Sequence, residues 1–225
     1  MKGFLNRQKE TMTTKIIIIR HGFSETNKSK KFTGQMDIGL SDVGKKQAEL
    51  VSSYLYDNYK IDKIYSSDLS RAVNTIKPLA DKLGTSVVTN KGLREIYGGK
   101  WEGVSFDDIS KLYSEDYIIW TENVGFARPT GGESFAEGQE RIVNTINEIV
   151  KREEGNTVVI VSHGGVLRGF ECFVQGKTLD YVNNIPYFQN ASISLIEYDG
   201  VKMQFKSRDF TEHLGELHTA MPKGI

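Results

Sequence analysis

The chain has 225 residues, of which 29 are Lys or Arg and 29 are Asp or Glu, so its formal net charge is zero. This length is sufficient for one domain with a sizeable core. The balanced charge excludes the net cationic field that gathers nucleic acid, although a local cationic pocket is still allowed.

The cysteine content and the hydropathy pattern indicate a cytoplasmic protein. Cys172 is the single cysteine, which excludes an intrachain disulfide and any multi-cysteine metal site. Residues 1–14 are polar and lack the apolar stretch of a signal peptide. No later apolar run approaches the roughly 18 residues that cross a bilayer. We therefore expect no membrane partner.

The first half of the chain alternates between strand and helix patterns. Residues 1–13 show no periodicity and predict a disordered lead, followed by a single domain over residues 14–225. β-branched runs predict strands, and apolar residues at helical spacing behind a capping residue predict helices. The expected elements are strands at 15–19, 63–66 and 86–89, a helix from the cap Ser41 to Tyr59, and a helix from Ser67 or Asp68 to Gly84.

The second half continues the alternation after one irregular stretch. Residues 97–132 contain both tryptophans and predict a lid-like insertion over the carboxyl end of the sheet. Ser134-x-x-Glu137 is a capping box that opens a helix reaching Gly155. We further expect a strand at 157–161, a helix at 166–175, and a hairpin of strands 192–198 and 202–205.

These elements predict an α/β fold with three layers, α/β/α. Alternating strands and helices favour a mainly parallel sheet, because each helix carries the chain back to the end of the sheet where the previous strand began, so the next strand runs in the same direction. The hairpin adds an antiparallel edge strand. Its free edge could pair across a homodimer.

Two histidines share one sequence context. His21 and His163 each follow a buried β-branched run and precede glycine, at the strand ends where open α/β sheets bind ligands. Arg20 precedes the first histidine, and Arg71 lies near the start of the helix that follows another strand. If these strands are neighbours, the side chains converge on a pocket that suits a phosphate dianion. The N–H of Gly22 could add a hydrogen bond.

Other chemistries find less support in the sequence. The segment Gly39-Leu-Ser-Asp-Val-Gly44-Lys45 has P-loop spacing, but Lys46 replaces the required Ser or Thr and no strand precedes it. The histidines lack metal-ligand spacing, so we predict neither a metal nor another cofactor. Cys172 lies in an apolar helix and is expected to be a core residue.

Five sequence blocks in register resemble the histidine phosphatase superfamily, which has the phosphoglycerate-mutase-like fold. The similarity extends from Lys15 to Tyr198. The blocks are Arg20-His21-Gly22 with Asn27, Ser66-Ser67-Asp68-Leu69-Ser70-Arg71-Ala72, Leu93-Arg94-Glu95, Gly131-Gly132-Glu133-Ser134, and Ser162-His163-Gly164-Gly165.

The resemblance implies a role for each matching residue. His21 would be the nucleophile that forms a phosphohistidine. Glu95 would protonate the leaving oxygen and then activate water. Arg20, Asn27, Arg71 and His163 would hold the phosphoryl oxygens, and the substrate-binding set would include Gly22, Thr33, Gly34 and Gly164.

Departures from the family pattern favour hydrolysis over mutase action. Phe23 stands where Glu or Gln is common, and Thr26 replaces an aromatic residue. Phe32-Thr33-Gly34 is similar to the mutase loop, but Ile96 replaces the mutase arginine and the insertion is shorter. We therefore expect a metal-independent phosphomonoester hydrolase acting on small phosphorylated metabolites. The alternatives are a cofactor-dependent phosphoglycerate mutase and a catalytically silent phosphate-binding module.

Overall fold

The computed structural model describes residues 12–219, and the expected disordered lead lies outside this range apart from its last two residues. Within it, a six-stranded sheet has the strand order β3-β2-β4-β1-β5-β6. The first four strands in this order are parallel, β5 is antiparallel to β1, and β6 is antiparallel to β5. The strands are β1 Thr14–Arg20, β2 Lys63–Ser66, β3 Val87–Thr89, β4 Thr157–Ser162, β5 Ile193–Tyr198 and β6 Met203–Phe210.

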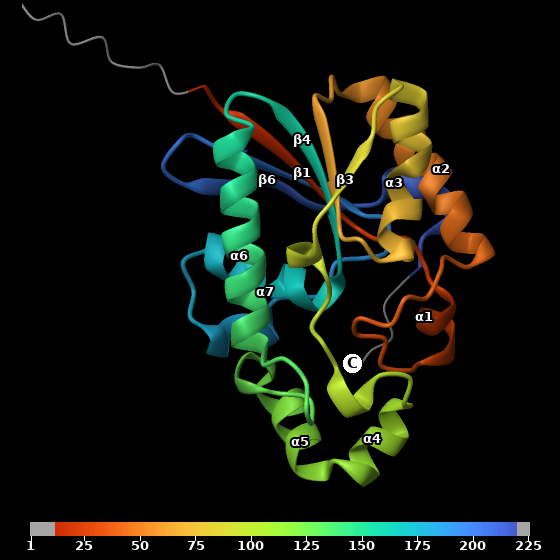
Figure 1. The fold of residues 1–225 in the computed structure, drawn as a ribbon, viewed down its shortest axis with the longest axis vertical. Coiled ribbons are helices and arrows are strands. Elements are labelled where there is room, and N and C mark those ends of the chain that lie inside the picture. The colour runs from red at the N-terminus through yellow and green to blue at the C-terminus, as the bar shows by residue number, and fades with distance from the viewer. Residues whose placement is uncertain (1–11, 220–225) are drawn as a thin grey trace, which may run out of the picture.

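Helices cover both faces of the sheet, which confirms the predicted three layers (Figure 1). Successive isoleucines of β1 point to opposite faces, as a strand requires. Ile16 and Ile18 belong to the apolar cluster of α6 and α7, whereas Ile17 and Ile19 belong to that of α2 and α3. These four helices are α2 Asp42–Asn58, α3 Ser70–Leu83, α6 Phe135–Arg152 and α7 Gly164–Val174.

Two predicted helix caps are confirmed and one is wrong. The hydroxyl of Ser41 accepts the N–H of Gly44 at the start of α2, and Ser134 forms its capping box with Glu137. At α3 the N-cap residue is Leu69, not Ser67 or Asp68. Asp68 is occupied by an ion pair with Arg94. The carboxylate of Asp37 accepts the N–H of Ser70 in its place.

Two other element bounds differ from the prediction because distant segments extend them. Helix α7 begins at Gly164, two residues earlier than expected, since a carboxylate from another segment accepts the N–H groups of its first turn. Strand β6 extends to Phe210 instead of Phe205, because its polar second half pairs with β5 as far as Ile193. An edge strand can carry such polar residues toward solvent.

The stretch 97–132 is more regular than expected. It contains α4 Phe106–Leu112 and α5 Ser114–Glu122, which lie below the sheet in Figure 1. Trp101 and Trp120 are buried and pack edge-to-face, and each also contacts the ring of Phe32. The short helix α1 Glu25–Ser29 was not predicted. The 3-10 helices are η1 Lys91–Leu93, η2 Gly99–Trp101, η3 Val124–Phe126, η4 Leu179–Asn184 and η5 Glu212–Leu217.

Candidate active site

The sheet topology brings the two matched histidines together. β1 and β4 are direct neighbours, so His21 and His163 follow the ends of adjacent parallel strands. Their ring centroids are 5.0 Å apart. Arg20 comes from the end of β1 and Arg71 from the first turn of α3, which follows β2 on the other side of β4. The predicted convergence at one end of the sheet is therefore found.

The imidazole of His21 is held in one orientation by its own chain neighbour. Its Nδ1 lies 2.8 Å from the carbonyl oxygen of Gly22. A carbonyl oxygen can only accept, so Nδ1 carries the proton and Nε2 keeps its lone pair. Burial lowers the pKa of His21 well below its ordinary 6.5, and the nearby cations Arg71 and Arg20 lower it further. His21 is therefore neutral at physiological pH.

The second histidine is buried more deeply. His163 has no exposed surface, and neither ring nitrogen has a hydrogen-bond partner within residues 12–219. Burial is also the main cause that lowers its pKa well below 6.5, followed by the charge of Arg71. His163 does not itself line the cavity, but its ring lies beside that of His21 and has one donor and one acceptor free for a group bound there.

The two arginines are buried cations anchored by backbone carbonyls. Arg20 donates from Nη1 to the carbonyl of Phe188 at 2.6 Å. Arg71 donates to the carbonyls of Met36 and Gly34, each at 2.7 Å. Burial lowers the pKa of Arg71 to about 10 and also lowers that of Arg20. The pKa of Arg71 keeps its guanidinium protonated at neutral pH, and both arginines are fixed beside the histidines.

The carboxylate of Glu95 lies at the N-terminus of α7. It accepts the N–H groups of Gly165 and Val166, both at 2.9 Å, and that of Ile96 at 3.0 Å. Free N–H groups at a helix N-terminus favour a negative charge there. This arrangement fixes the carboxylate at the pocket and explains the early start of α7.

Two predicted glycine contacts to substrate need correction. The N–H of Gly22 donates to the hydroxyl of Thr75 at 2.8 Å, so it is not available to a phosphoryl group. Its carbonyl orients His21 instead. Gly164 does not line the pocket, whereas Gly165 does. A Cβ at Gly164 would lie 3.1 Å from Nε of Arg20, so this glycine permits a close approach of that side chain.

The other predicted binding residues line the pocket. Asn27 closes the capping box of α1 and accepts from the N–H of Ser24 through Oδ1. Thr33 donates its hydroxyl proton to Thr26 at 2.7 Å. Gly34 lines the pocket and its carbonyl also anchors Arg71.

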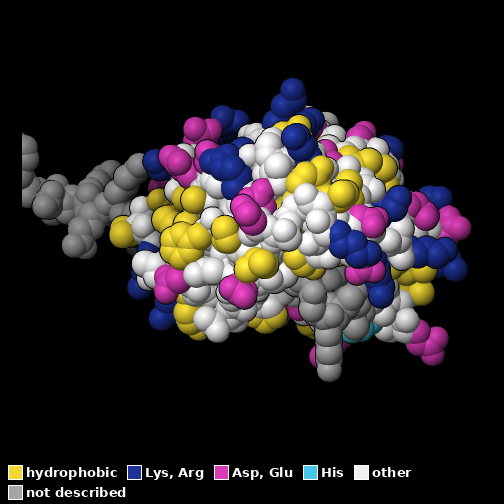
Figure 2. Space-filling model, turned by 90° about the horizontal axis from the view of Figure 1, so that it is seen from below, with side chains coloured by type: hydrophobic (Ala, Val, Ile, Leu, Met, Phe, Trp, Pro, Cys, Tyr) yellow, Lys and Arg dark blue, Asp and Glu magenta, His cyan; other side chains and the backbone are white. Residues whose placement is uncertain are grey.

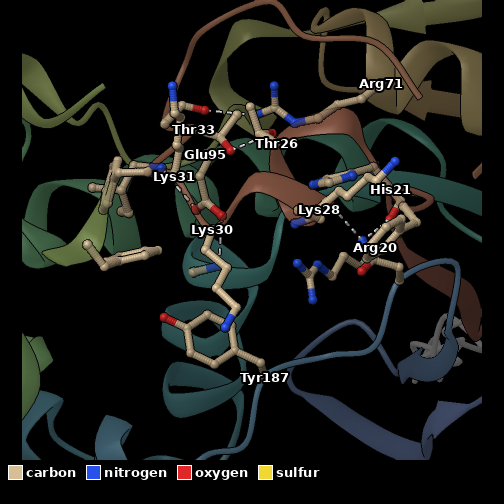
Figure 3. A pocket seen from close by; sticks show the side chains of 18 of the residues that line it. Arg20, His21, Thr26, Lys28, Lys30, Lys31, Thr33, Arg71, Glu95 and Tyr187 are labelled. Carbon is tan, nitrogen blue, oxygen red and sulfur yellow. Dashed lines mark hydrogen bonds between the residues drawn. The ribbon is translucent and has the colours of Figure 1, made fainter. Parts of the chain in front are cut away.

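Sequence reasoning missed several residues of this pocket. Asn190 donates to the carbonyl of His21 at 2.9 Å, and Tyr187 lines the wall from the same non-periodic segment. Lys28, Lys30 and Lys31, from the segment after β1, also line the pocket and were not predicted to do so. The pocket has a volume of about 340 Å³. Tyr187 and the three lysines are labelled among its lining side chains in Figure 3. The further lining residues are Phe23, Phe32, Ile96, Phe106 and Trp120.

A neutral, oriented histidine between buried arginines, with a carboxylate at the same pocket, defines a phosphoryl-transfer site. Residues 16–211 match the family model of the histidine phosphatase superfamily (branch 1), and the chain belongs to this family. It is a phosphoric monoester hydrolase.

Three relatives cover nearly the whole chain. It is 33% identical over 211 residues to phosphoserine phosphatase 1 of Hydrogenobacter thermophilus, covering 94% of this chain and 99% of that protein. It is 31% identical to phosphoglycerate mutase-like protein 4 of Arabidopsis thaliana, covering 89% and 87%. The solved structure of Bacillus stearothermophilus YhfR has a TM-score of 0.85 and 28% identity, covering 89% and 99%.

The described residues were also searched for membrane and metal features. None of the helices in residues 12–219 is long and apolar enough to span a bilayer. The same part of the chain contains no group of three or more His, Cys, Asp or Glu side chains placed to hold a metal ion. Cys172 is buried, as the sequence predicted.

Proposed function

We propose that the chain hydrolyses small phosphate monoesters by transferring their phosphoryl group to Nε2 of His21. The observation that carries this proposal is the hydrogen bond between Nδ1 of His21 and the carbonyl of Gly22, which leaves the Nε2 lone pair on a neutral ring. A neutral imidazole nitrogen is a competent nucleophile. The relative named phosphoserine phosphatase supports a small phosphate ester as substrate.

The buried cations bind the phosphoryl group in this proposal. Arg20 and Arg71 offer guanidinium N–H groups to the phosphoryl oxygens, and His163 and Asn27 each add one donor. Catalysis of phosphoryl transfer depends mainly on position and on charge at the equatorial oxygens. Two fixed guanidinium groups supply that charge without a metal ion.

Hydrolysis proceeds in two displacements. In the first, Nε2 of His21 bonds to phosphorus while the bond from phosphorus to the ester oxygen breaks, and Glu95, which is protonated in the enzyme–substrate complex, gives its proton to that oxygen. In the second, a water oxygen attacks phosphorus, Glu95 takes the water proton, and the bond from Nε2 to phosphorus breaks. Phosphate leaves, and both side chains return to their starting states.

The test measures phosphate release from p-nitrophenyl phosphate in excess EDTA. We expect turnover by the native protein, none by His21→Ala, and an acid-labile phosphate on the peptide that contains His21 after a rapid quench. Turnover that EDTA abolishes, or turnover that survives in His21→Ala, would overturn the mechanism. Binding of phosphate without turnover would identify a silent binding module instead.

A phosphoglycerate mutase is the second candidate because its similar loop reaches the pocket. Thr33 and Gly34, which belong to that loop, line the cavity beside His21, and one relative is named phosphoglycerate mutase-like. Interconversion of 3- and 2-phosphoglycerate that is faster than phosphate release would favour the mutase.

Two further expectations concern the setting of the enzyme. We place it in the cytoplasm, where a single buried thiol stays reduced. We also propose a homodimer paired along the outer edge of β6, which has no strand partner within the described residues. Sedimentation equilibrium of the full chain would decide between dimer and monomer.

A further inference from the structure

Positive charge is concentrated in the pocket although the chain as a whole is neutral. Figure 2 shows basic and acidic side chains interspersed over one end of the molecule. The pocket lining instead includes five Lys or Arg residues and one acid, Glu95. A bound phosphate dianion matches only two of these five positive charges. The unmatched charge points to a second anionic group on the substrate.

The excess charge comes from three lysines of one short segment. Lys28, Lys30 and Lys31 all line the pocket that holds His21 and Glu95 (Figure 3). None of the three forms an ion pair or a side-chain hydrogen bond with any residue in 12–219. Other surface lysines do so: Lys45 pairs with Asp42, and Lys77 with Asp81. The ammonium groups of the pocket lysines are therefore available to a ligand.

Backbone hydrogen bonds fix this segment beside the pocket. Lys31 forms an antiparallel bridge with Ser105. The N–H of Phe32 donates to the carbonyl of Val104 at 2.9 Å, and its carbonyl accepts from Gly103 at 2.8 Å. The stretch 97–132 thus holds the lysine segment in place. The backbone that carries the three exposed lysine side chains is therefore a fixed part of the pocket wall.

The backbone at Lys30 has the left-handed conformation with which many helices end. This residue has a φ of 53°, in the left-handed region where glycine is normally favoured. A lysine is less favourable than glycine in this conformation, so a glycine substitution at Lys30 removes the side chain without straining the backbone.

We propose that Lys30 and Lys31, assisted by Lys28, form a subsite for a second anionic group of the substrate. The enzyme then selects phosphate monoesters whose leaving group carries a carboxylate or a further phosphate. This inference rests on the proposed hydrolysis through His21 and names the class of substrate for that site. The neighbouring Phe32, Phe106 and Trp120 line the same pocket and limit the space for the leaving group.

The test compares substrates that differ by one anionic group. O-phosphoserine and O-phosphoethanolamine share an amine and differ by a carboxylate, whereas fructose 1,6-bisphosphate and fructose 6-phosphate differ by a phosphate. We expect kcat/KM to be at least about 10-fold higher for the more anionic member of one pair, which corresponds to about 1.4 kcal/mol. A preference for O-phosphoserine would identify a carboxylate as the second anionic group, and a preference for fructose 1,6-bisphosphate would identify a phosphate. Equal kcat/KM values within both pairs would overturn the inference.

Matched variants assign the preference to the lysines. The double variant Lys30→Gln/Lys31→Gln should bring the ratio of kcat/KM values within the preferred pair close to one. The double variant Lys45→Gln/Lys77→Gln, which removes two positive charges away from the pocket lining, should leave that ratio unchanged. High salt should also reduce the native ratio, because exposed charges are screened. A ratio that persists in the double variant would overturn the inference.

Lys30→Gly separates a specificity role from a structural one. Glycine accepts the left-handed backbone without strain, so this variant should unfold at a higher denaturant concentration and yet discriminate less between the paired substrates. A destabilised variant with unchanged discrimination would contradict the proposal.

Turnover of p-nitrophenyl phosphate shows whether a negative result contradicts only the lysine subsite or the proposed function as well. Native turnover of this compound without a preference in either pair would overturn the lysine subsite alone. No native turnover of any substrate would overturn the proposed function and the subsite with it.

Discussion

Nδ1 of His21 donates to the carbonyl oxygen of Gly22, the next residue in the chain, over 2.8 Å. The same glycine donates its N–H to Thr75 of α3, so the peptide that orients the imidazole is itself held by a neighbouring helix. This pair of contacts explains how a histidine at a strand end presents Nε2 to the pocket. It also leads to the first prediction.

His21 should remain a neutral Nδ1–H tautomer through pH 6.5. Burial and the charges of Arg71 and Arg20 lower its pKa, so protons bind only at more acidic pH. Nuclear magnetic resonance of ¹⁵N-histidine-labelled protein reports both tautomer and titration, with His21→Gln identifying the signal. A His21 signal that titrates at pH 6.5 or above would contradict the prediction.

The free energy of unfolding should decrease as the pH falls below 6.5. The unfolded chain then binds protons at His21 and His163, whereas the folded chain does not, because both pKa values are lowered by burial. Well above pH 6.5 both histidines are neutral in both states and contribute no pH dependence. Urea denaturation gives the free energy of unfolding at each pH in this range. The slope of that free energy against pH should be smaller in His163→Gln than in the native protein. Equal slopes would show that His163 does not contribute to the pH dependence of stability.

Glu95→Gln should slow hydrolysis most for substrates with poor leaving groups. An amide cannot supply a proton to an alkyl oxygen, so kcat/KM, which reports formation of the phosphohistidine, should fall by about 10² to 10⁴ for an alkyl phosphate. p-Nitrophenolate leaves without a proton, so the decrease in kcat/KM for p-nitrophenyl phosphate should be much smaller. Equal losses for the alkyl and aryl substrates would show that Glu95 does not act as the general acid.

Arg141→Lys should reduce catalysis by loosening the segment that carries Glu95. The Arg141 guanidinium donates to the carbonyls of Gly92, Arg94 and Glu95, at 2.9, 2.8 and 3.2 Å. Lysine cannot reproduce this planar fork. We expect kcat for alkyl phosphates to fall about 10-fold with little change in KM, since small displacements of a catalytic group are costly.

The surface residue Arg128, which pairs with Glu137, provides the matched control for this variant. Arg128→Lys should leave kcat unchanged. A fall in kcat that is equally large for alkyl and aryl phosphates would indicate general damage to the pocket, contrary to a positioning role through Glu95.

Gly44→Ala should destabilise the fold, although alanine normally favours a helix. A Cβ at this position would overlap the backbone carbonyl of Phe23. We expect the free energy of unfolding to drop by about 2 kcal/mol, within the range of overpacked sites. The Cβ that Gly39→Ala adds would have no atom within 4 Å, so this variant should change the free energy of unfolding by less than about 0.5 kcal/mol. Chemical denaturation of the two variants checks both values.

Part of the site could be predicted because its residues lie in distinctive local patterns. His21 and His163 end β-branched runs, and in a parallel sheet such ends meet at one edge. The family blocks added Glu95 and Asn27, which periodicity alone would have left as loop residues. Asn190 and Tyr187 lie in a segment without periodicity, so no local signal marked them.

The sequence by itself determined the α/β class, the layers and the starts of α2 and α6. These depend on hydrophobic periodicity and on caps such as Ser41 and Ser134, which act over a few neighbouring residues. Only the tertiary structure decided which groups are shared between distant segments. Glu95 binds the first turn of α7, and Asp37 caps α3, because hydrogen bonds depend on distance in space. For the same reason, only the folded chain showed that Lys30 and Lys31 line the pocket of His21.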